Sequence, residues 1–444
     1  MSSHSVHAPP PVPGNAASSA SAALNARIFR RLMPLLVLSY VISFIDRTNI
    51  ALAKTHIEVD LGISAAAYGL GAGLFFLSYA LLEVPSNLVM HRVGARFWIT
   101  RIMVTWGLLS AGMAFITGET SFYVMRVLLG AAEAGLFPGV MLYLTYWFGR
   151  EERARAIGYF LLGVCIANIL SGPVGGALLQ MDGILGWHGW QWMFVIEGLP
   201  AVALAWVVWK KLPDGPASAP WLTAAESRQV MERLQAEQDQ QARAGQVGHS
   251  LGDCLRDRQI WLAILVYFCH QISIYTVIFF LPGIIGTYGQ LSPLQIGTLN
   301  SVPWIAAAIG AAWLPRFATH PQRCRRMLLA GLATMAAGLL VAALAGKASP
   351  ALGLLGFSLT ALMFFVVQSV VFLFPASRLA GAGLAGGIAL VNTCGLVGGF
   401  IGPTVMGMIE QATGSTRNGL FIMAGLLVVA ALASTRLRQG QETP

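Results

Sequence analysis

Long apolar stretches alternate with short polar ones along almost the whole chain. Each apolar run is close to, or longer than, the roughly 20 residues that a helix needs to cross a bilayer, and the longest runs can tilt within it. The pattern predicts an all-α polytopic membrane protein. We expect twelve membrane-spanning helices, at residues 32–53, 68–90, 97–117, 121–148, 155–180, 190–210, 259–283, 292–315, 326–346, 350–374, 384–410 and 417–435.

A long hydrophilic segment at 213–258 separates the sixth run from the seventh, and its mixed-charge part at 221–240 could form a surface helix. Gly-Pro motifs recur at matching positions of the fifth and eleventh runs, SGPVGG at 171–176 and IGPTVMG at 401–407. Two repeated halves around a site at mid-membrane depth are typical of secondary transporters. The predicted organisation is a disordered tail at 1–26, a six-helix bundle at 27–212, a linker at 213–258, a second six-helix bundle at 259–436 and a tail at 437–444.

Composition and charge support a membrane location. Hydrophobic residues make up 56% of the chain and charged residues only 11%, whereas soluble proteins carry about 25% charged residues. The net charge of +9 does not indicate nucleic-acid binding, because the basic residues lie in short loops between apolar runs. Of the 28 Lys and Arg, 23 fall on the side that holds both chain ends and 3 on the opposite side. The positive-inside rule therefore predicts cytoplasmic termini.

Several classes of function have no support in the chain. The first 26 residues are rich in Ser, Ala and Pro and lack the apolar core of a signal peptide. The five cysteines show neither metal-ligand spacing nor a disulfide pattern. No catalytic cluster, nucleotide-binding loop or signalling domain is visible, so an enzyme or a membrane receptor is not favoured. We predict no cofactor, with a proton gradient as the driving force.

Four charged residues lie deep inside two apolar runs, where ionised side chains are costly and usually face a bundle interior. Asp46 and Arg47 lie in the first run, and Arg126 and Glu133 in the fourth. The two arginines lie about 9 and 8 Å from the outer ends of their helices, and Glu133 lies two turns below Arg126. Two arginines suit a carboxylate ligand, and Glu133 and Asp46 suit proton carriers. The alternative is an internal Asp46–Arg47 pair that joins helices.

Other polar residues share the middle level of the predicted bundle, and their roles remain open. His270 could contact substrate, relay protons or be a core histidine; Gln271 and Asn168 could line a cavity or bond neighbouring helices. We expect Glu83 in a gate or at a helix end, and Glu197 and Glu410 at the membrane interface. The candidates for lining a cavity are Tyr79, Asn168, His270, Gln271 and Asn392.

Five motifs extend over most of the chain: FIDRTNIALA, EVPSNLVMHRVGARFWITRIMVTWG, RVLLGAAEAGLFPGV, GWQWMFVIEGLPA and NTCGLVGGFIGP. In these motifs the sequence resembles the anion:cation symporter branch of the major facilitator superfamily, whose members carry organic anions with protons. The resemblance implies that Arg47 and Arg126 bind the substrate carboxylate. It also implies that Asp46 and Glu133 couple to protons, and that Tyr79 and Asn392 contact substrate.

Two positions depart from the family pattern. His91 stands where the loop after the second helix usually has an acid, and His270 stands where vesicular glutamate transporters have a third arginine. The sequence thus predicts a monomeric, proton-coupled importer of a small organic anion in a bacterial inner membrane. A sugar acid, a dicarboxylate and an aromatic acid all remain open as substrate. Anion exchange or facilitated diffusion without protons is the alternative mechanism.

Overall fold

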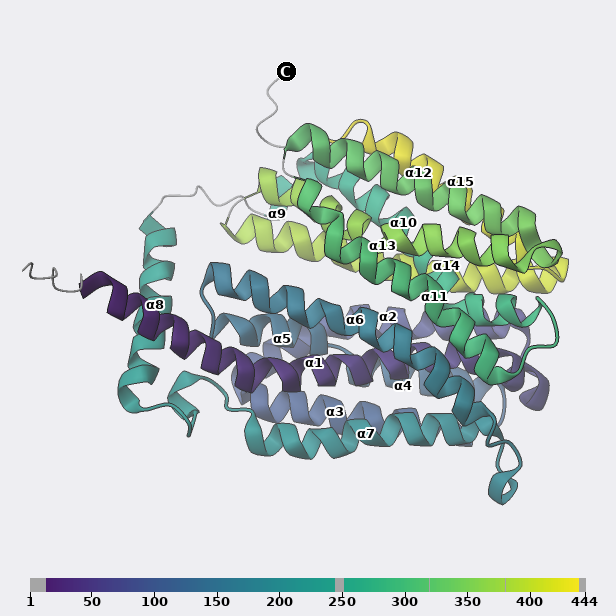
Figure 1. Ribbon diagram of the computed structural model, residues 1–444, viewed down its shortest axis with the longest axis horizontal. Coiled ribbons are helices and arrows are strands. Elements are labelled where there is room, and N and C mark those ends of the chain that lie inside the picture. Colours follow the sequence, from purple (N-terminus) through teal and green to yellow (C-terminus); the bar gives the residue numbers. More distant parts are fainter. Residues whose placement is uncertain (1–12, 244–250, 319, 380, 439–444) are drawn as a thin grey trace, which may run out of the picture.

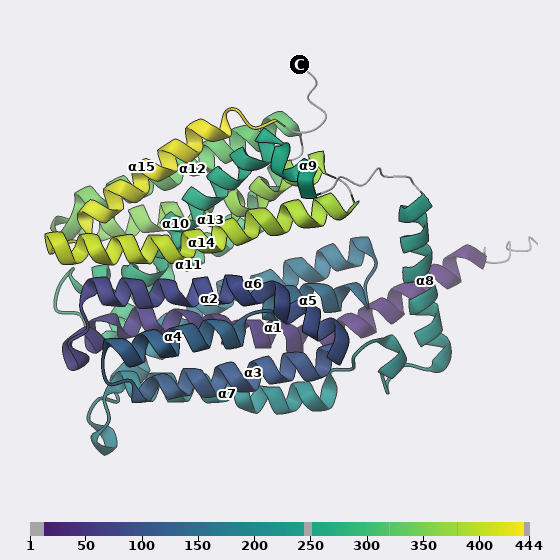
Figure 2. The same ribbon diagram turned by 180° about the vertical axis from the view of Figure 1, so that it is seen from behind.

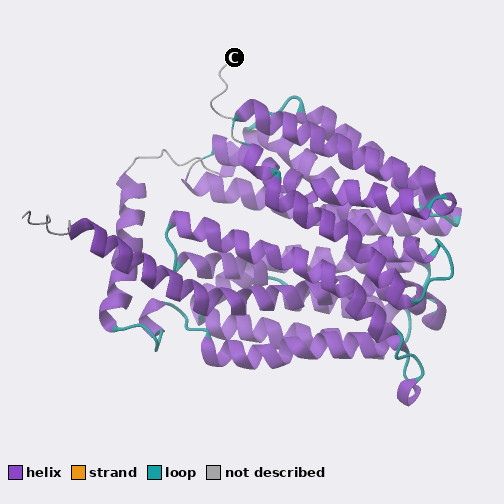
Figure 3. Cartoon of the chain, in the orientation of Figure 1, coloured by secondary structure: helices purple, strands orange, loops and turns teal. Residues whose placement is uncertain are grey.

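The computed structural model describes residues 13–243, 251–318, 320–379 and 381–438, and this part of the chain contains helices and loops but no strand (Figure 3). The helices are α1 (Pro13–Leu61), α2 (Ala65–Val93), α3 (Ala95–Gly112), α4 (Glu119–Glu133), α5 (Leu136–Thr145), α6 (Arg150–Leu179), α7 (Gly189–Lys211), α8 (Ala224–Arg243), α9 (Leu251–Arg256), α10 (Arg258–Gly286), α11 (Pro293–Trp313), α12 (Pro321–Ala345), α13 (Pro350–Arg378), α14 (Gly381–Thr413) and α15 (Arg417–Ser434).

Each predicted span corresponds to one helix, except that the fourth is divided between α4 and α5. Within the described residues, eleven spans are long and apolar enough to cross a membrane, α4 and α5 counting as one. The remaining span is α11, in which Gln295, Asn300 and Ser301 lower the mean hydropathy. The predicted all-α membrane fold is therefore confirmed.

The helices form two bundles that lie side by side (Figures 1 and 2). The first contains α1 to α7 and the second contains α10 to α15, and the bundles meet where α2 packs on α14 and α6 on α11. The start of α1 lies at the same end of the molecule as α8 and α9 (Figure 1). The end of α15 also lies there, because Gln259 at the start of α10 hydrogen-bonds to Arg436 and Arg438. We call this the termini end, and the opposite end the far end.

Glycines bring the two bundles into backbone contact near the far end. A Cβ atom on Gly297 of α11 would lie 1.9 Å from the carbonyl oxygen of Gly172 of α6, and a Cβ on Gly69 of α2 would lie 2.3 Å from that of Pro403 of α14. Small residues allow this close approach between membrane helices. The bundles are therefore closed against each other at the far end.

The predicted tail and linker differ partly from expectation. The disordered tail at 1–26 is wrong for its second half, because α1 begins at Pro13; the Ala-rich segment from residue 16 to 26 favours a helix. Residues 1–12 and 439–444 lie outside the described residues. The surface helix predicted in the linker is confirmed as α8. Its residue Glu226 forms an ion pair with Arg27 of α1, which attaches α8 to the first bundle.

Candidate functional site

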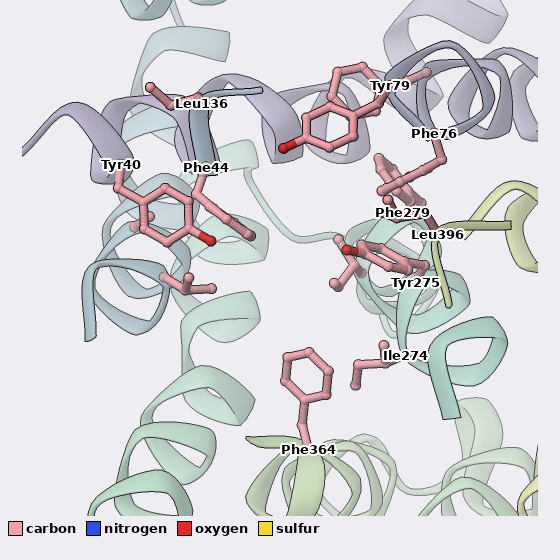
Figure 4. Close-up of a cluster of buried hydrophobic side chains, with 14 of the residues drawn as sticks. Tyr40, Phe44, Phe76, Tyr79, Leu136, Ile274, Tyr275, Phe279, Phe364 and Leu396 are labelled. Atoms are coloured by element: carbon pink, nitrogen blue, oxygen red, sulfur yellow. The ribbon is translucent and has the colours of Figure 1, made fainter. Parts of the chain in front are cut away.

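A small cavity lies between the two bundles at mid-depth, and we call it the central cavity. Its volume is about 100 Å³, and nine of its nineteen lining residues are aromatic. Figure 4 shows the hydroxyl groups of Tyr40, Tyr79 and Tyr275 pointing toward one another, with Phe364 facing them. Charged and amide side chains complete the lining: Arg47, Glu83, Asn168, Gln271, Gln368 and Asn392.

A larger cavity of about 610 Å³ extends from the central cavity toward the termini end. The two share Glu83, Gln368 and Asn392, together with three apolar residues. Another cavity, of about 910 Å³, lies at the far end, but it shares no lining residue with the central cavity. The glycine contacts between the bundles lie near this end, so the central cavity connects toward the termini end and is closed off from the far end. We call the cavity of about 610 Å³ the termini-side cavity.

Arg47 is the cationic group of the central cavity, and it is paired. Its guanidinium lies 2.5 Å from Oε1 of Glu133, which also accepts a hydrogen bond of 2.5 Å from the hydroxyl of Ser43. The guanidinium carbon lies 4.8 Å from the ring centre of Phe44 and 5.2 Å from that of Tyr79. Breaking a buried pair of this kind by removing one partner typically costs about 3–5 kcal/mol. The Arg47 side chain is thus held in place by the carboxylate of Glu133 and by the aromatic rings of Phe44 and Tyr79.

A break in the fourth span lies directly after Glu133. Glu133 is the last residue of α4, and Gly135 has a φ of +95° that favours glycine. A Cβ on Gly135 would also lie 2.1 Å from the hydroxyl oxygen of Ser86. That hydroxyl donates to the carbonyl of Ala134 at 2.7 Å and accepts from Nε1 of Trp98 at 2.9 Å. The predicted span at 121–148 is therefore one membrane span with a short break, at which the Ser86 hydroxyl of α2 bonds the carbonyl of Ala134.

Arg126 lies close to Arg47 but not on the wall of the central cavity. It is 1% exposed and donates to the carbonyls of Gly71 and Ala72 on α2, at 3.2 and 3.3 Å. Both guanidiniums contact Phe75, with carbon-to-ring distances of 5.2 Å for Arg47 and 4.9 Å for Arg126. In this conformation two nitrogens of the Arg126 guanidinium, which was predicted to hold a carboxylate, donate instead to backbone oxygens of α2.

Asp46 points to the other side of α1. Its carboxylate accepts hydrogen bonds from Nε1 of Trp106 at 2.7 Å and from the hydroxyl of Ser110 at 3.0 Å, both on α3. The alternative of an Asp46–Arg47 pair is therefore wrong, because consecutive helical positions point about 100° apart. Glu197, expected at the interface, is 6% exposed and buried inside the first bundle.

The other predicted lining residues divide into two groups. Tyr79, Gln271 and Asn392 line the central cavity. His270 does not; it is fully buried, with its ring stacked between Tyr267 and Phe364 at centroid distances of 6.0 and 5.3 Å. Asn168 lines the cavity, although its amide also donates to the carbonyl of Val164 in its own helix at 2.8 Å.

Sequence reasoning missed several lining residues. Gln368 of α13 and Trp304 of α11 both line the central cavity, as do most of its aromatic residues. Gln368 stands in an otherwise apolar run, and such a polar position is a signal for a functional site. The aromatic residues carry no such signal, because in an all-apolar helix the sequence does not show which face is turned inward.

Two helical bundles around a cavity at mid-depth are the arrangement typical of secondary transporters. Residues 36–403 match the family model of the Major Facilitator Superfamily, and the chain belongs to that superfamily. The predicted family is therefore confirmed, and the protein is a multi-pass transporter of this type.

Relatives and a solved structure agree with this assignment. The chain is 41% identical over 418 residues to a protein of Agrobacterium vitis named "Putative tartrate transporter", covering 93% of this chain and 94% of the relative. It is 40% identical over 422 residues to the "Quinolone resistance transporter" of Acinetobacter baumannii, covering 93% and 95%. The inward open structure of the xylose transporter XylE from E. coli shares the fold, with a TM-score of 0.73, 13% identity and coverage of 93% and 97%.

Proposed function

We propose that the protein carries a small organic anion together with a proton across the bacterial inner membrane, with both termini in the cytoplasm. The anion's carboxylate binds Arg47. Tyr79, Gln271 and Asn392 contact the rest of the substrate. In this orientation the termini-side cavity opens to the cytoplasm, and the glycine contacts close the periplasmic end.

The Arg47–Glu133 ion pair at the cavity wall carries the proposal. An entering carboxylate competes with Glu133 for the guanidinium, whose Nε atom has no hydrogen-bond partner among the described residues. If substrate takes Arg47, Glu133 is left as an unpaired buried charge, which is strongly unfavourable. Binding a proton removes that charge. Anion and proton therefore enter together, because each makes the site favourable for the other.

The lining favours an anion with an aromatic body. Aromatic walls pack well against a flat apolar ring, whereas the hydroxyls of a sugar acid would lack partners over most of this surface. The side-chain oxygens of Gln271 and Gln368 line the cavity and have no hydrogen-bond partner among the described residues. They can accept hydrogen bonds from a hydroxyl group on the substrate. A hydroxyaromatic monocarboxylate combines these features.

Arg126 and Asp46 have supporting roles in this proposal. In the conformation that opens at the far end, α2 moves relative to α4. Arg126 then releases the backbone carbonyls of α2 and binds the substrate carboxylate instead. Asp46 binds a proton on the opposite side of α1. Both assignments follow the family resemblance, and each predicts a transport defect when the side chain is replaced.

Uptake into proteoliposomes tests the proposal. Hydroxybenzoate, phthalate, tartrate and gluconate are offered with and without an inward proton gradient. We expect gradient-driven accumulation of the hydroxyaromatic acid above the others. Glu133→Gln should lose accumulation but keep exchange of substrate for substrate, while Glu119→Gln, at the far end of the same helix, should behave as the parent protein. Uptake that ignores the gradient, with accumulation intact in Glu133→Gln, would instead establish exchange or facilitated diffusion.

Export of aromatic acids is a second candidate. The aromatic lining and the similarity to a relative named for quinolone resistance both favour it. Proteoliposomes loaded with a quinolone distinguish the two directions. Proton-driven loss of the drug from the lumen indicates export, whereas proton-driven accumulation of an organic acid indicates import.

A further inference from the structure

We propose that Glu83 is a second recognition point for the substrate and binds a positively charged group on it. The carried molecule is then a zwitterion, an aromatic carboxylic acid with an ammonium group at its other end. This inference deepens the proposed function and rests on it for the place of the carboxylate at Arg47. Glu83 was expected in a gate or at a helix end, and it lines both the central cavity and the termini-side cavity.

The carboxylate of Glu83 is buried without a partner. Glu83 is 8% exposed. Within the described residues no ion pair or side-chain hydrogen bond involves its carboxylate, and Arg47, the cation of the central cavity, is paired with Glu133. The amide of Asn87 donates to the backbone carbonyl of Glu83 and not to its side chain. Because buried carboxylates are normally paired or hydrogen-bonded, the unpartnered one indicates a ligand that supplies a positive charge.

The groups near Glu83 offer further unused acceptors. Gln368 lines both cavities and Asn87 lines the termini-side cavity, and the side-chain oxygen of each has no hydrogen-bond partner in the described part of the chain. Among the described residues that line the termini-side cavity, Glu83 is the only charged one. An ammonium group has three donors and no acceptor. It therefore matches a place with a carboxylate and free amide oxygens.

The spacing along α2 sets the length of the molecule. Tyr79 and Glu83 are four residues apart, so they share one face of the helix and lie about 6 Å apart along its axis. The ring centre of Tyr79 lies 5.2 Å from the guanidinium carbon of Arg47. A molecule that reaches from Arg47 past the Tyr79 ring to Glu83 thus spans roughly one helical turn. A benzene ring holds two para substituents at a similar separation.

The balance of charges favours a zwitterion over a simple anion. When the substrate carboxylate takes Arg47 and a proton neutralises Glu133, Glu83 is left as an unpaired carboxylate in the same small cavity. A simple anion would then be repelled by Glu83, and one buried negative charge would have no partner. An ammonium group on the substrate pairs with Glu83. Every charge in the site then has a partner.

Calorimetry with a matched pair of ligands and the purified full-length protein tests this inference. Para-(aminomethyl)benzoate and para-ethylbenzoate have nearly the same shape, but only the first carries an ammonium group. The parent protein should bind the first at least about tenfold more tightly, because a charge-assisted hydrogen bond replaces an apolar contact. Glu83→Gln should lose this preference and bind para-ethylbenzoate as well as the parent protein or better, since a repelling charge is gone.

Two further variants serve as controls. Glu83→Asp retains the charge and should keep a reduced preference for the ammonium compound. Glu119→Gln removes an exposed carboxylate of α4 and should keep the full preference. Thermal melting shows that each variant is folded.

Equal affinity of the parent protein for the two ligands would overturn the inference, because Glu83 would then engage no ammonium group. A preference that survives in Glu83→Gln would also overturn it. In either case the proposed function stands if hydroxybenzoate binds the parent protein and binds more weakly to Arg47→Lys. If the parent protein bound no aromatic carboxylate at all, the proposed function would fail and this inference with it.

Discussion

The contact between Gly172 and Gly297 provides a direct test of which end of the transporter is closed. A Cβ atom on Gly297 would lie 1.9 Å from the carbonyl oxygen of Gly172, and ordinary contact begins near 3.4 Å. To admit one methyl group, α6 and α11 would therefore have to separate by about 1.5 Å. Because the two helices belong to different bundles, the strain acts on the closure between them.

Overpacking of a tight contact typically costs about 1–3 kcal/mol. In Gly297→Ala this cost applies only while the far end is closed, since the bundles separate there in the alternate conformation. The equilibrium should therefore shift roughly 5- to 150-fold toward the conformation open at the far end. A shift toward the conformation closed at the far end, or no shift, would contradict this expectation.

Distances between spin labels measure this shift. Labels at Thr117 and Gln290, on exposed loops beyond α3 and α10, report the separation of the bundles at the far end in a variant without native cysteines. Gly297→Ala should increase the population with a longer distance. Gly310→Ala is the matched control, because its Cβ would lie 1.9 Å from the carbonyl of Leu362 within the second bundle. A parent-like distance distribution in Gly297→Ala, or an equal change in Gly310→Ala, would show that the Gly172–Gly297 contact does not hold the far end closed.

Three further changes test other parts of the structure. Arg47→Lys should weaken substrate binding at least about tenfold, because a point charge replaces a planar fork; calorimetry that finds near-parental affinity would contradict this. Ser86→Ala should cost about 1–3 kcal/mol, because it leaves the Ala134 carbonyl and the Trp98 indole without their partner; a melting temperature equal to that of the parent protein would exclude this role. Glu410→Gln removes one of the two partners of Lys54, whose ammonium lies 2.9 Å from Glu410 and 3.0 Å from Glu58. It should change the label distances less than Gly297→Ala does, because Glu58 remains.

The two adjacent charged residues of α1 have different partners: Arg47 pairs with Glu133, and Asp46 accepts hydrogen bonds from Trp106 and Ser110. Arg47 lines the central cavity next to the ring of Tyr79, and Asp46 faces the interior of its own bundle.

The sequence by itself determined the membrane fold and the main charged candidates. Hydropathy is a local property, so the positions of the spans could be predicted within a few residues, together with the long hydrophilic linker. The high cost of a charge in lipid identified Arg47, Arg126, Glu133 and Asp46 as unusual without any structure. The positive-inside rule predicted the orientation in the same way.

Only the tertiary structure decided which groups meet. The direction of a side chain depends on how helices rotate and pack, and apolar helices give little sign of this in their periodicity. Packing placed Glu133 on Arg47, held Arg126 against the backbone of α2, and buried His270 between two rings. It also buried Glu197, which was expected at the membrane interface, inside the first bundle. These pairings depend on contacts between distant parts of the chain, which local sequence patterns do not encode.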